Sequence, residues 1–301
     1  MSFIGRLENV DLRLLRVFNA IAENGGISGA ADRLSVDRST ISRQLTDLET
    51  RLQLRLCERS RAGFSLTEEG RIVLAKTQDL FGAVRSFNMH INDIHKELSG
   101  DLIIAVSDTS VLNEALNMPA VLRKFNEEAP NVRYTVKSMS PDDIERAVNN
   151  RSCSLGIMTS QATTSTLDFL ALYEEENALY VHRQHPLFSR HTLTLEAIKK
   201  HEIAVLQYET YMTRLVRELE LKVGPVTNNT EGLLSLIQTG KFLGILPTFY
   251  AKIFDQSGDL RRVHLPETTY ATDMGILAHP RDRSSSMIKL FSNILRDSLS
   301  N

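Results

Sequence analysis

Residues 27–52, with the sequence ISGAADRLSVDRSTISRQLTDLETRL, contain two short helical patterns joined by a tight turn. Apolar residues recur at helical spacing in the second pattern, so we expect Ile41, Leu45, Leu48 and Leu52 to face inward. The opposite face is basic and rich in hydroxyl groups. This feature limits the fold strongly, because a helix of this kind in a helix-turn-helix unit is suited to enter a DNA groove.

The outward face of the second helix carries polar side chains, mostly in its first two turns. Arginine can bridge O6 and N7 of guanine, while serine and threonine hydroxyls can bond phosphates or bases. Acidic residues, Asp47 and Glu49, come only later in the helix. Taken alone, this face could equally be an ordinary solvated surface, so its context decides. The candidate DNA-binding residues on this helix are Arg38, Ser39, Thr40, Ser42, Arg43 and Thr46.

An earlier helix is predicted in front of this pair. Leu14, Phe18 and Ile21 lie at helical spacing, and the NGG at residues 24–26 supplies a stop. Three helical segments therefore precede residue 53, as a helix-turn-helix domain requires.

Short polar residues stand at the start of both helices of the pair. Ser28 and Asp37 are expected to cap them, and Ser28 is a further candidate for DNA contact. Ala30, Ala31 and Leu34 form a small apolar face that suits close packing against a neighbouring helix.

A short β-hairpin, or wing, is predicted in the following stretch, ERSRAGFSLTEEG. Basic residues surround a glycine there, and the alternation of Phe64 and Leu66 is typical of a strand. Arg59 and Arg61 on such a hairpin would reach the DNA backbone or the adjacent minor groove. Both join the candidate DNA-binding residues.

Residues 10–70 resemble the winged helix-turn-helix of the LysR-type transcriptional regulators. The matching run is AADRLSVDRSTISRQLTDLETRLQLRLCERSRAGFSLTEEG, and the later chain is also similar to that family, so the resemblance covers nearly the whole sequence. It implies a DNA-binding domain at residues 1–66. Asp37 and Arg38 stand where family members usually have Ser-Gln, so we expect an operator that differs from the family's commonest one.

One long helix is predicted for the linker, residues 67–99. Thr67 is a good cap, two glutamates follow it, and no proline interrupts the segment. Its apolar residues form a heptad seam, which needs a partner; packing within the same subunit is the alternative. The resemblance implies an antiparallel pairing of linker helices in a dimer, and hence an operator with dyad symmetry. The seam consists of Val73, Leu80, Phe87 and Ile94 with Thr77, Val84, Ile91 and Leu98.

After Gly100 the pattern alternates strand and helix, which predicts an α/β fold with a mostly parallel sheet. The resemblance implies a two-lobed effector-binding domain with the periplasmic binding protein fold. Crossovers are expected near residues 161–168 and 267–273. The expected domain is 100–301, with lobe I at 100–164 and 271–301 and lobe II at 165–270.

A ligand cleft is expected between the lobes, because open α/β sheets bind ligands at the carboxyl ends of their strands. Polar residues follow several strands, and free amides at Thr230 would hold an anion such as a carboxylate. Helix capping and turn formation are the duller explanation for such residues. The candidate effector-binding residues are Ser107, Asp108, Thr109, Ser140, Thr159, Tyr208 and Thr230.

The composition argues against membrane-spanning, secreted, disulfide-framework and zinc-binding proteins. The sequence has no apolar run long enough for a membrane span and no secretory leader, so a cytoplasmic protein is expected. Cys57 and Cys153 are too few and too far apart for a disulfide framework or a zinc site; buried thiols are favoured over redox sensing.

Residues 1–65 contain ten arginines, no lysine and eight acidic residues, a net charge of +2, against −4 for the remainder. Arginine suits phosphate and guanine contacts.

The leading hypothesis is a transcriptional regulator, not an enzyme, whose DNA binding or activation responds to a small effector. No nucleophile elbow, phosphate loop, zinc signature or dinucleotide fingerprint occurs in the sequence, and no cofactor is expected. His182, His185 and His191 are predicted in a surface turn rather than a metal site. The expected partners are double-stranded DNA, the effector and further copies of this chain in a homodimer or homotetramer. Contact with RNA polymerase is an alternative that the sequence leaves open. A solute binder or enzyme on the same body, and an architectural DNA binder, are the rival hypotheses. Effector identity and the sign of regulation stay open.

Overall fold

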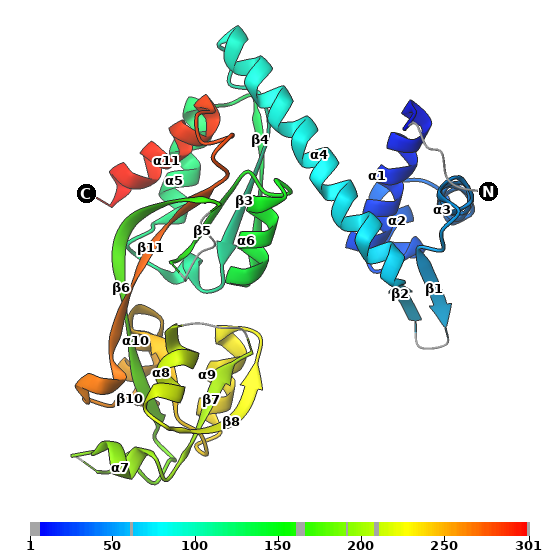
Figure 1. The fold of residues 1–301 in the computed structure, drawn as a ribbon. Coiled ribbons are helices and arrows are strands. Elements are labelled where there is room, and N and C mark those ends of the chain that lie inside the picture. Colours follow the sequence, from blue (N-terminus) through cyan, green and yellow to red (C-terminus); the bar gives the residue numbers. More distant parts are fainter. Residues whose placement is uncertain (1–6, 61–62, 161–165, 191, 208–210, 300–301) are drawn as a thin grey trace. The chain divides into compact units, whose positions relative to one another are not determined.

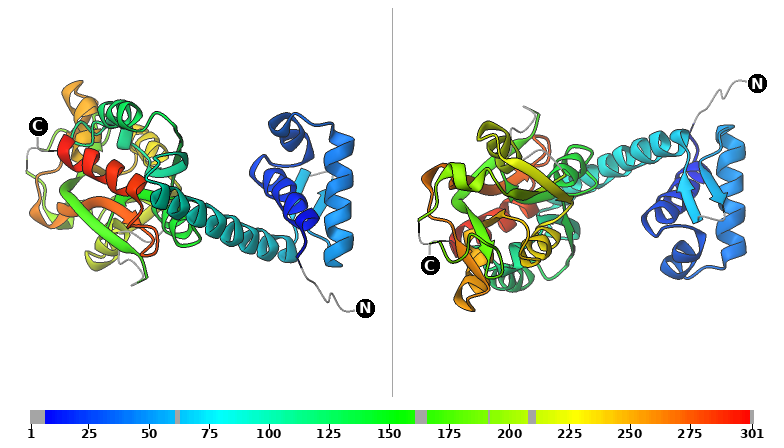
Figure 2. Two further views of the ribbon diagram at one scale, coloured as in Figure 1. Left: turned by 90° about the horizontal axis from the view of Figure 1, so that it is seen from above. Right: turned by 90° about the horizontal axis from the view of Figure 1, so that it is seen from below.

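The computed structural model describes residues 7–299, except for 61–62, 161–165, 191 and 208–210. Within these ranges the chain forms two compact units. The head unit comprises Met1–Arg85 with Asn150–Ser152, and the body unit comprises Ser86–Asn149 with Cys153–Asn301. Helix α4 (Glu68–His95) is unbroken and contributes to both units, which confirms the prediction of one long helix after the head (Figure 2).

The head unit contains three helices followed by a two-stranded hairpin (Figure 1). The NGG segment ends the first helix, as predicted, and Gly26 adopts φ +132°, a conformation that favours glycine. The hairpin strands pair antiparallel from Cys57 opposite Leu66 to Ser60 opposite Gly63, which confirms the predicted wing. The elements are α1 (Asn9–Glu23), α2 (Ile27–Leu34), α3 (Arg38–Leu52), β1 (Cys57–Ser60) and β2 (Gly63–Leu66).

The predicted apolar faces of α1 and α3 form the core of the head. Leu52 packs against this core while partly exposed. Leu34, by contrast, is 40% exposed, so its predicted inward position is wrong. Helix α2 has only eight residues; Ala30 and Ala31 are buried in the core, and Ile27 packs against it while partly exposed. The buried core residues predicted from sequence are Leu14, Phe18, Ile21, Ile41, Leu45 and Leu48.

Two of the three predicted caps differ in the structure. Helix α2 begins at Ile27, after Gly26, so Ser28 lies within its first turn and caps nothing. Asp37 occupies the cap position of α3, but its backbone carbonyl rather than its side chain accepts the hydrogen bond, from the N–H of Thr40 (2.9 Å). Thr67 is a cap as predicted, since its Oγ1 accepts a 2.8 Å hydrogen bond from the N–H of Gly70.

Lobe I of the body consists of three parallel strands with helices on both faces (Figure 1). Helices α5 and α11 cover one face, where the rings of Phe125 and Phe291 meet edge to face at 5.4 Å. Helix α6 covers the other face through Ile144 and Val148. The elements are β3 (Gly100–Ser107), the 3-10 turn η1 (Ser110–Leu112), α5 (Met118–Glu128), β4 (Val132–Met139), α6 (Pro141–Asn149), β5 (Leu155–Thr159) and α11 (Ser286–Ser298).

Lobe II has its own apolar core, built around β7, α9 and β9. The sequence patterns did not reveal β8, whose Gly224 and Pro225 are unfavourable within a strand. It pairs with β7 in a parallel two-stranded sheet. The elements are α7 (Leu195–Ile198), β7 (Glu202–Leu206), α8 (Tyr211–Glu218), β8 (Lys222–Thr227), α9 (Thr230–Gln238), β9 (Gly244–Pro247), α10 (Thr248–Gln256), β10 (Leu260–Arg262) and the 3-10 turn η2 (Pro266–Thr268).

Two long antiparallel strands, β6 (Asp168–His182) and β11 (Tyr270–Ala278), connect the lobes (Figure 1). They pair with each other from Asp168 opposite Ala278 to Asn177 opposite Tyr270. In lobe I, β11 pairs with β5, whereas in lobe II β6 pairs with β9 and β10. The parallel pairing predicted for the strands after Gly100 is confirmed for β3, β4 and β5. The connecting strands β6 and β11 are antiparallel, because the chain crosses from lobe I to lobe II and returns along the same path.

Candidate DNA-contacting face and ligand cleft

The outward face of α3 brings the predicted DNA-binding residues together. Ser39, Arg43 and Thr46 follow one another at helical spacing, so they form one stripe, and Arg38 and Ser42 lie beside it. Arg38, Ser39, Arg43 and Thr46 are exposed, while Thr40 and Ser42 are half-buried. The Thr46 hydroxyl donates to the carbonyl of Ser42 at 3.1 Å.

The arginines of this face differ from the arginine at the other end of the helix. Arg51 donates to the carboxylates of Asp11 on α1 and of Glu8 just before it, and the hydrogen bond from Arg51 holds the pKa of Asp11 below its ordinary value. Among the residues that the structure describes, Arg38 and Arg43 form no ion pair. Arg51 thus fixes α3 against α1, whereas Arg38 and Arg43 present their cations to solvent.

The hairpin is joined to α3 by an acidic side chain. The Glu49 carboxylate accepts hydrogen bonds from the N–H groups of Leu56 (2.7 Å) and Cys57 (3.2 Å), so it orients β1 relative to the helix. Of the predicted wing residues, Arg59 lies in β1, and Arg61 falls outside the described residues.

Ser28 is exposed on α2, near the turn between α1 and α2. Phe64 of the hairpin packs against this turn, since a Cβ at Gly26 would come within 3.3 Å of the Phe64 side chain. Close packing here ties the hairpin to the helix pair. Ser28, α3 and the hairpin consequently belong to one rigid head.

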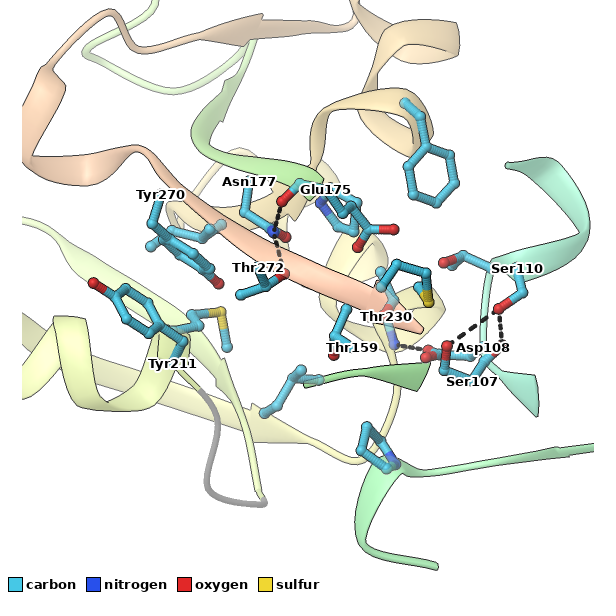
Figure 3. A pocket seen from close by; sticks show the side chains of 18 of the residues that line it. Ser107, Asp108, Ser110, Thr159, Glu175, Asn177, Tyr211, Thr230, Tyr270 and Thr272 are labelled. Carbon is cyan, nitrogen blue, oxygen red and sulfur yellow. Dashed lines mark hydrogen bonds between the residues drawn. The ribbon is translucent and has the colours of Figure 1, made fainter. Parts of the chain in front are cut away.

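A cleft lies between the two lobes of the body, and it contains two adjoining cavities of about 90 and 570 Å³. Residues of lobe I, of lobe II and of the two connecting strands line the smaller one (Figure 3). Asp108 and Thr109 line both cavities. The predicted effector-binding residues are thus grouped around one cleft, apart from Tyr208, which lies outside the described residues.

The predicted residues line different parts of the cleft and differ in their hydrogen bonds. Ser107 is buried, and its hydroxyl lies 3.1 Å from that of Ser110. Thr159 lines the smaller cavity at the end of β5. Ser140 lines the larger cavity and caps α6, because its hydroxyl donates to the Asp143 carboxylate (2.6 Å) and accepts from the Asp143 N–H (3.3 Å). Ser140 is therefore a helix cap as well as a residue that lines the cleft.

The N-terminus of α9 is already occupied by a carboxylate of the protein itself. The Thr230 N–H donates to Oδ2 of Asp108 at 2.5 Å. The expectation of a free amide at Thr230 is wrong, because the loop after β3 reaches across the cleft and directs Asp108 to this helix end. A negative side chain there is favoured by both the hydrogen bond and the helix dipole.

Glu175 is the main cleft residue that the sequence patterns did not reveal. It lies on β6, is 6% exposed, and lines the smaller cavity together with Asn177, Tyr270 and Thr272 from the two connecting strands. The Asn113 side chain donates to its carboxylate at 3.2 Å. Burial, opposed by that hydrogen bond and assisted by the charge of Asp108, raises the pKa of Glu175 to about 7.

A local signal for Glu175 exists in the run EEEN at residues 174–177. Adjacent strand residues point to opposite faces, so Glu174 and Glu176 are exposed while Glu175 and Asn177 are buried. The sequence alone does not say which pair faces inward.

Two of the histidines considered above and both cysteines are buried inside the protein. His182 and His185 are buried, so their predicted placement in a surface turn is wrong; His191 lies outside the described residues. The His185 ring packs edge to face on that of His201 at 4.7 Å. Cys57 and Cys153 are buried thiols, as expected. Within the described residues, no group of side chains is arranged to hold a metal ion, and no helix is long and apolar enough to cross a bilayer.

Comparison with known families gives two matches that together span most of the chain. Residues 12–71 match the family described as bacterial regulatory helix-turn-helix protein, lysR family. Residues 95–300 match the LysR substrate binding domain.

Individual relatives agree with these matches. The HTH-type transcriptional activator BauR of Pseudomonas aeruginosa is 34% identical over 291 residues, covering 96% of this chain and 95% of BauR. The crystal structure of CbnR, a LysR family transcriptional regulator, superposes with a TM-score of 0.64 at 19% identity, covering 96% of this chain and 99% of CbnR. Full-length CbnR complexed with its target DNA gives a TM-score of 0.62 at 21% identity, with 95% and 99% covered.

Proposed function

The chain belongs to the LysR family of DNA-binding transcriptional regulators, which carry an effector-binding domain, and from this premise we propose which of its residues do the binding. Arg38, Ser39 and Arg43 of α3 contact base edges and phosphates in a DNA groove. A small effector occupies the cleft between the lobes of the body. The observation that carries the proposal is the pair of exposed arginines on α3, which form no ion pair with any described residue.

The side chains on the exposed face of α3 suit two different roles, readout of bases and contact with phosphates. A guanidinium can bond two acceptors on a guanine at once, so Arg43, in the exposed stripe, is suited to readout. Hydroxyl groups such as that of Ser39 bond phosphates without regard to sequence and set the register of the helix. Helix α3 is fixed to α1 through Arg51 and to the hairpin through Glu49, so its exposed face is presented rigidly.

We further propose that α4 pairs with its copy in a second subunit. The seam expected from the heptads divides into two parts: Val73 and Leu80 pack against the core of their own head, whereas Phe87 and Ile94 are 64% and 74% exposed. Exposed apolar groups of this size on one helix indicate a protein partner. A two-fold dimer places two copies of α3 on DNA, and the operator then has dyad symmetry.

Footprinting on the DNA upstream of the chain's own gene tests the proposal. The expected result is protection of two symmetric half-sites whose centres are separated by a whole number of helical turns. Binding is expected to weaken steeply as salt is raised, because arginine contacts to phosphates release counterions. Protection without symmetry would contradict the dimer, and no protection at moderate salt would contradict the assignment of α3.

A further inference from the structure

The cleft is acidic. The charged side chains that line the smaller cavity are Asp108 and Glu175, and the larger cavity adds Asp143 and Glu231. No lysine or arginine lines either cavity within the described part of the chain. Residues 161–165 and 208–210, which lie outside that part, contain no lysine or arginine in their sequences either. An anionic ligand would find no cationic side chain here and several negative ones.

Two of these acids already have partners that neutralise part of their charge. Asp108 accepts the Thr230 N–H at the positive end of α9. Asp143 accepts hydrogen bonds from Ser140 and Arg146. Glu231 is exposed to solvent in the first turn of α9. Glu175 is different, because it is buried and, among the described residues, its carboxylate receives a neutral hydrogen bond from Asn113 and no cationic one.

A buried carboxylate of this kind is stabilised most by a cation. Aromatic rings nearby would add to the attraction: Tyr211 and Tyr270 also line the smaller cavity, with ring centroids 4.6 Å apart. In Figure 3 these tyrosines lie on one side of the cavity and Asp108 lies on the other, with the Glu175 side chain between them. An ammonium group interacts favourably with both a carboxylate and a tyrosine ring face.

We propose that the effector of this cleft carries a protonated amine, and that its ammonium group pairs with the carboxylate of Glu175. This inference rests on the proposed function, in which the cleft is the effector site. Glu175 lies on β6, one of the two strands that connect the lobes, so the paired charges lie where the two lobes are joined.

The proposal includes a specific pH dependence. Burial raises the pKa of Glu175 to about 7, so the unliganded carboxyl is partly protonated near neutral pH. The titratable groups that face it are Asp108, across the cavity, and Tyr173, whose hydroxyl accepts from the same Asn113 amide. An ammonium binds the ionised form, so amine binding releases a proton from Glu175 and tightens as pH rises from about 6 to about 8.

The experiment is a thermal-shift and calorimetric titration of the full chain with three probes of equal chain length: butylamine, butanoate and butan-1-ol. Butylamine is expected to raise the unfolding temperature, more at about pH 8 than at about pH 6, and to release protons. Butanoate and butan-1-ol are expected to give no comparable shift. The variants are Glu175→Gln, which removes the charge and keeps the shape, and Glu174→Gln as the matched control on the exposed face of the same strand.

Glu175→Gln is expected to abolish the butylamine shift and its pH dependence, while Glu174→Gln keeps both. A larger shift with butanoate, an unchanged butylamine response in Glu175→Gln, or no butylamine shift in a titration to tens of millimolar would each overturn the proposal. The proposed function is tested separately by operator footprinting. Protection of operator DNA combined with failure of butylamine would refute the amine and leave the regulator intact.

Discussion

The carboxylate of Asp108, in the loop after β3, accepts a 2.5 Å hydrogen bond from the backbone N–H of Thr230, the first residue of α9. The two residues are 122 positions apart in sequence and belong to different lobes. Asp108 also lines both cavities of the cleft. The bond therefore links the two lobes across the cleft.

Replacing Asp108 with asparagine is expected to weaken this link. The amide oxygen still accepts the Thr230 N–H, but it loses the charge that the helix dipole favours, so the free energy of unfolding should fall by about 1 kcal/mol. Urea unfolding followed by circular dichroism measures the change. Glu127→Gln, on the exposed surface of α5, removes the same charge without a partner and should have little effect. Equal stability of Asp108→Asn and the parent chain would show that the charge of Asp108 contributes nothing to this link.

Arg43→Ala is expected to weaken specific operator binding by about 1–3 kcal/mol and to reduce the discrimination between operator and scrambled DNA, because a contact to a base edge is lost. Fluorescence anisotropy with operator and scrambled DNA at several salt concentrations measures both effects. Arg13→Ala removes an exposed arginine from α1 and so separates a local contact from a general loss of positive charge. If both variants bind equally well, Arg43 has no role in readout.

Phe87→Glu on α4 should produce a monomer. Phe87 is 64% exposed within the chain, so a glutamate there is harmless to the isolated subunit but places a charge in the proposed dimer interface. Sedimentation velocity reports the association state, and Asn88→Glu, at the neighbouring exposed position, is the control. A Phe87→Glu protein that sediments like its parent would rule out pairing through this face.

His185 should make lobe II less stable in acid. Burial, together with the charge of His201, lowers the pKa of His185 to about 4. Between the ordinary value near 6.5 and about 4, the unfolded chain binds a proton that the folded chain does not. The free energy of unfolding therefore falls as pH is lowered through this range, by up to about 1.4 kcal/mol per pH unit.

The variant His185→Asn tests this dependence. Its amide oxygen can replace Nδ1 of His185 as acceptor of the Leu187 N–H, a 3.1 Å bond, but it does not titrate. Urea unfolding at about pH 7 and about pH 5 should show a smaller loss of stability in this variant than in the parent. His264→Asn, at an exposed position, should retain the parent's loss. Identical pH dependence in all three proteins would exclude His185 as the cause.

Sequence periodicity was sufficient for the helices of the head and for the side of α3 that faces solvent. Ile41, Leu45 and Leu48 lie on one face because a helix repeats every 3.6 residues, and Arg38 and Arg43 are left on the other. The same local rules predicted the stop at residues 24–26, the cap at Thr67 and the long α4. They also identified polar strand ends, of which Asp108, Thr109 and Thr159 line the cleft.

Tertiary structure alone decided how those residues are used. The sequence shows that Asp108 is polar and follows a strand, but only the approach of the lobes brings it to Thr230. The orientation of Glu175 depends on the register between β6 and β11, since a shift by one residue would turn it outward and Glu174 inward. The burial of His185 depends likewise on its packing with His201. Local patterns follow from the backbone repeat of each element, whereas contacts between distant segments depend on how whole elements pack, which no short stretch of sequence encodes.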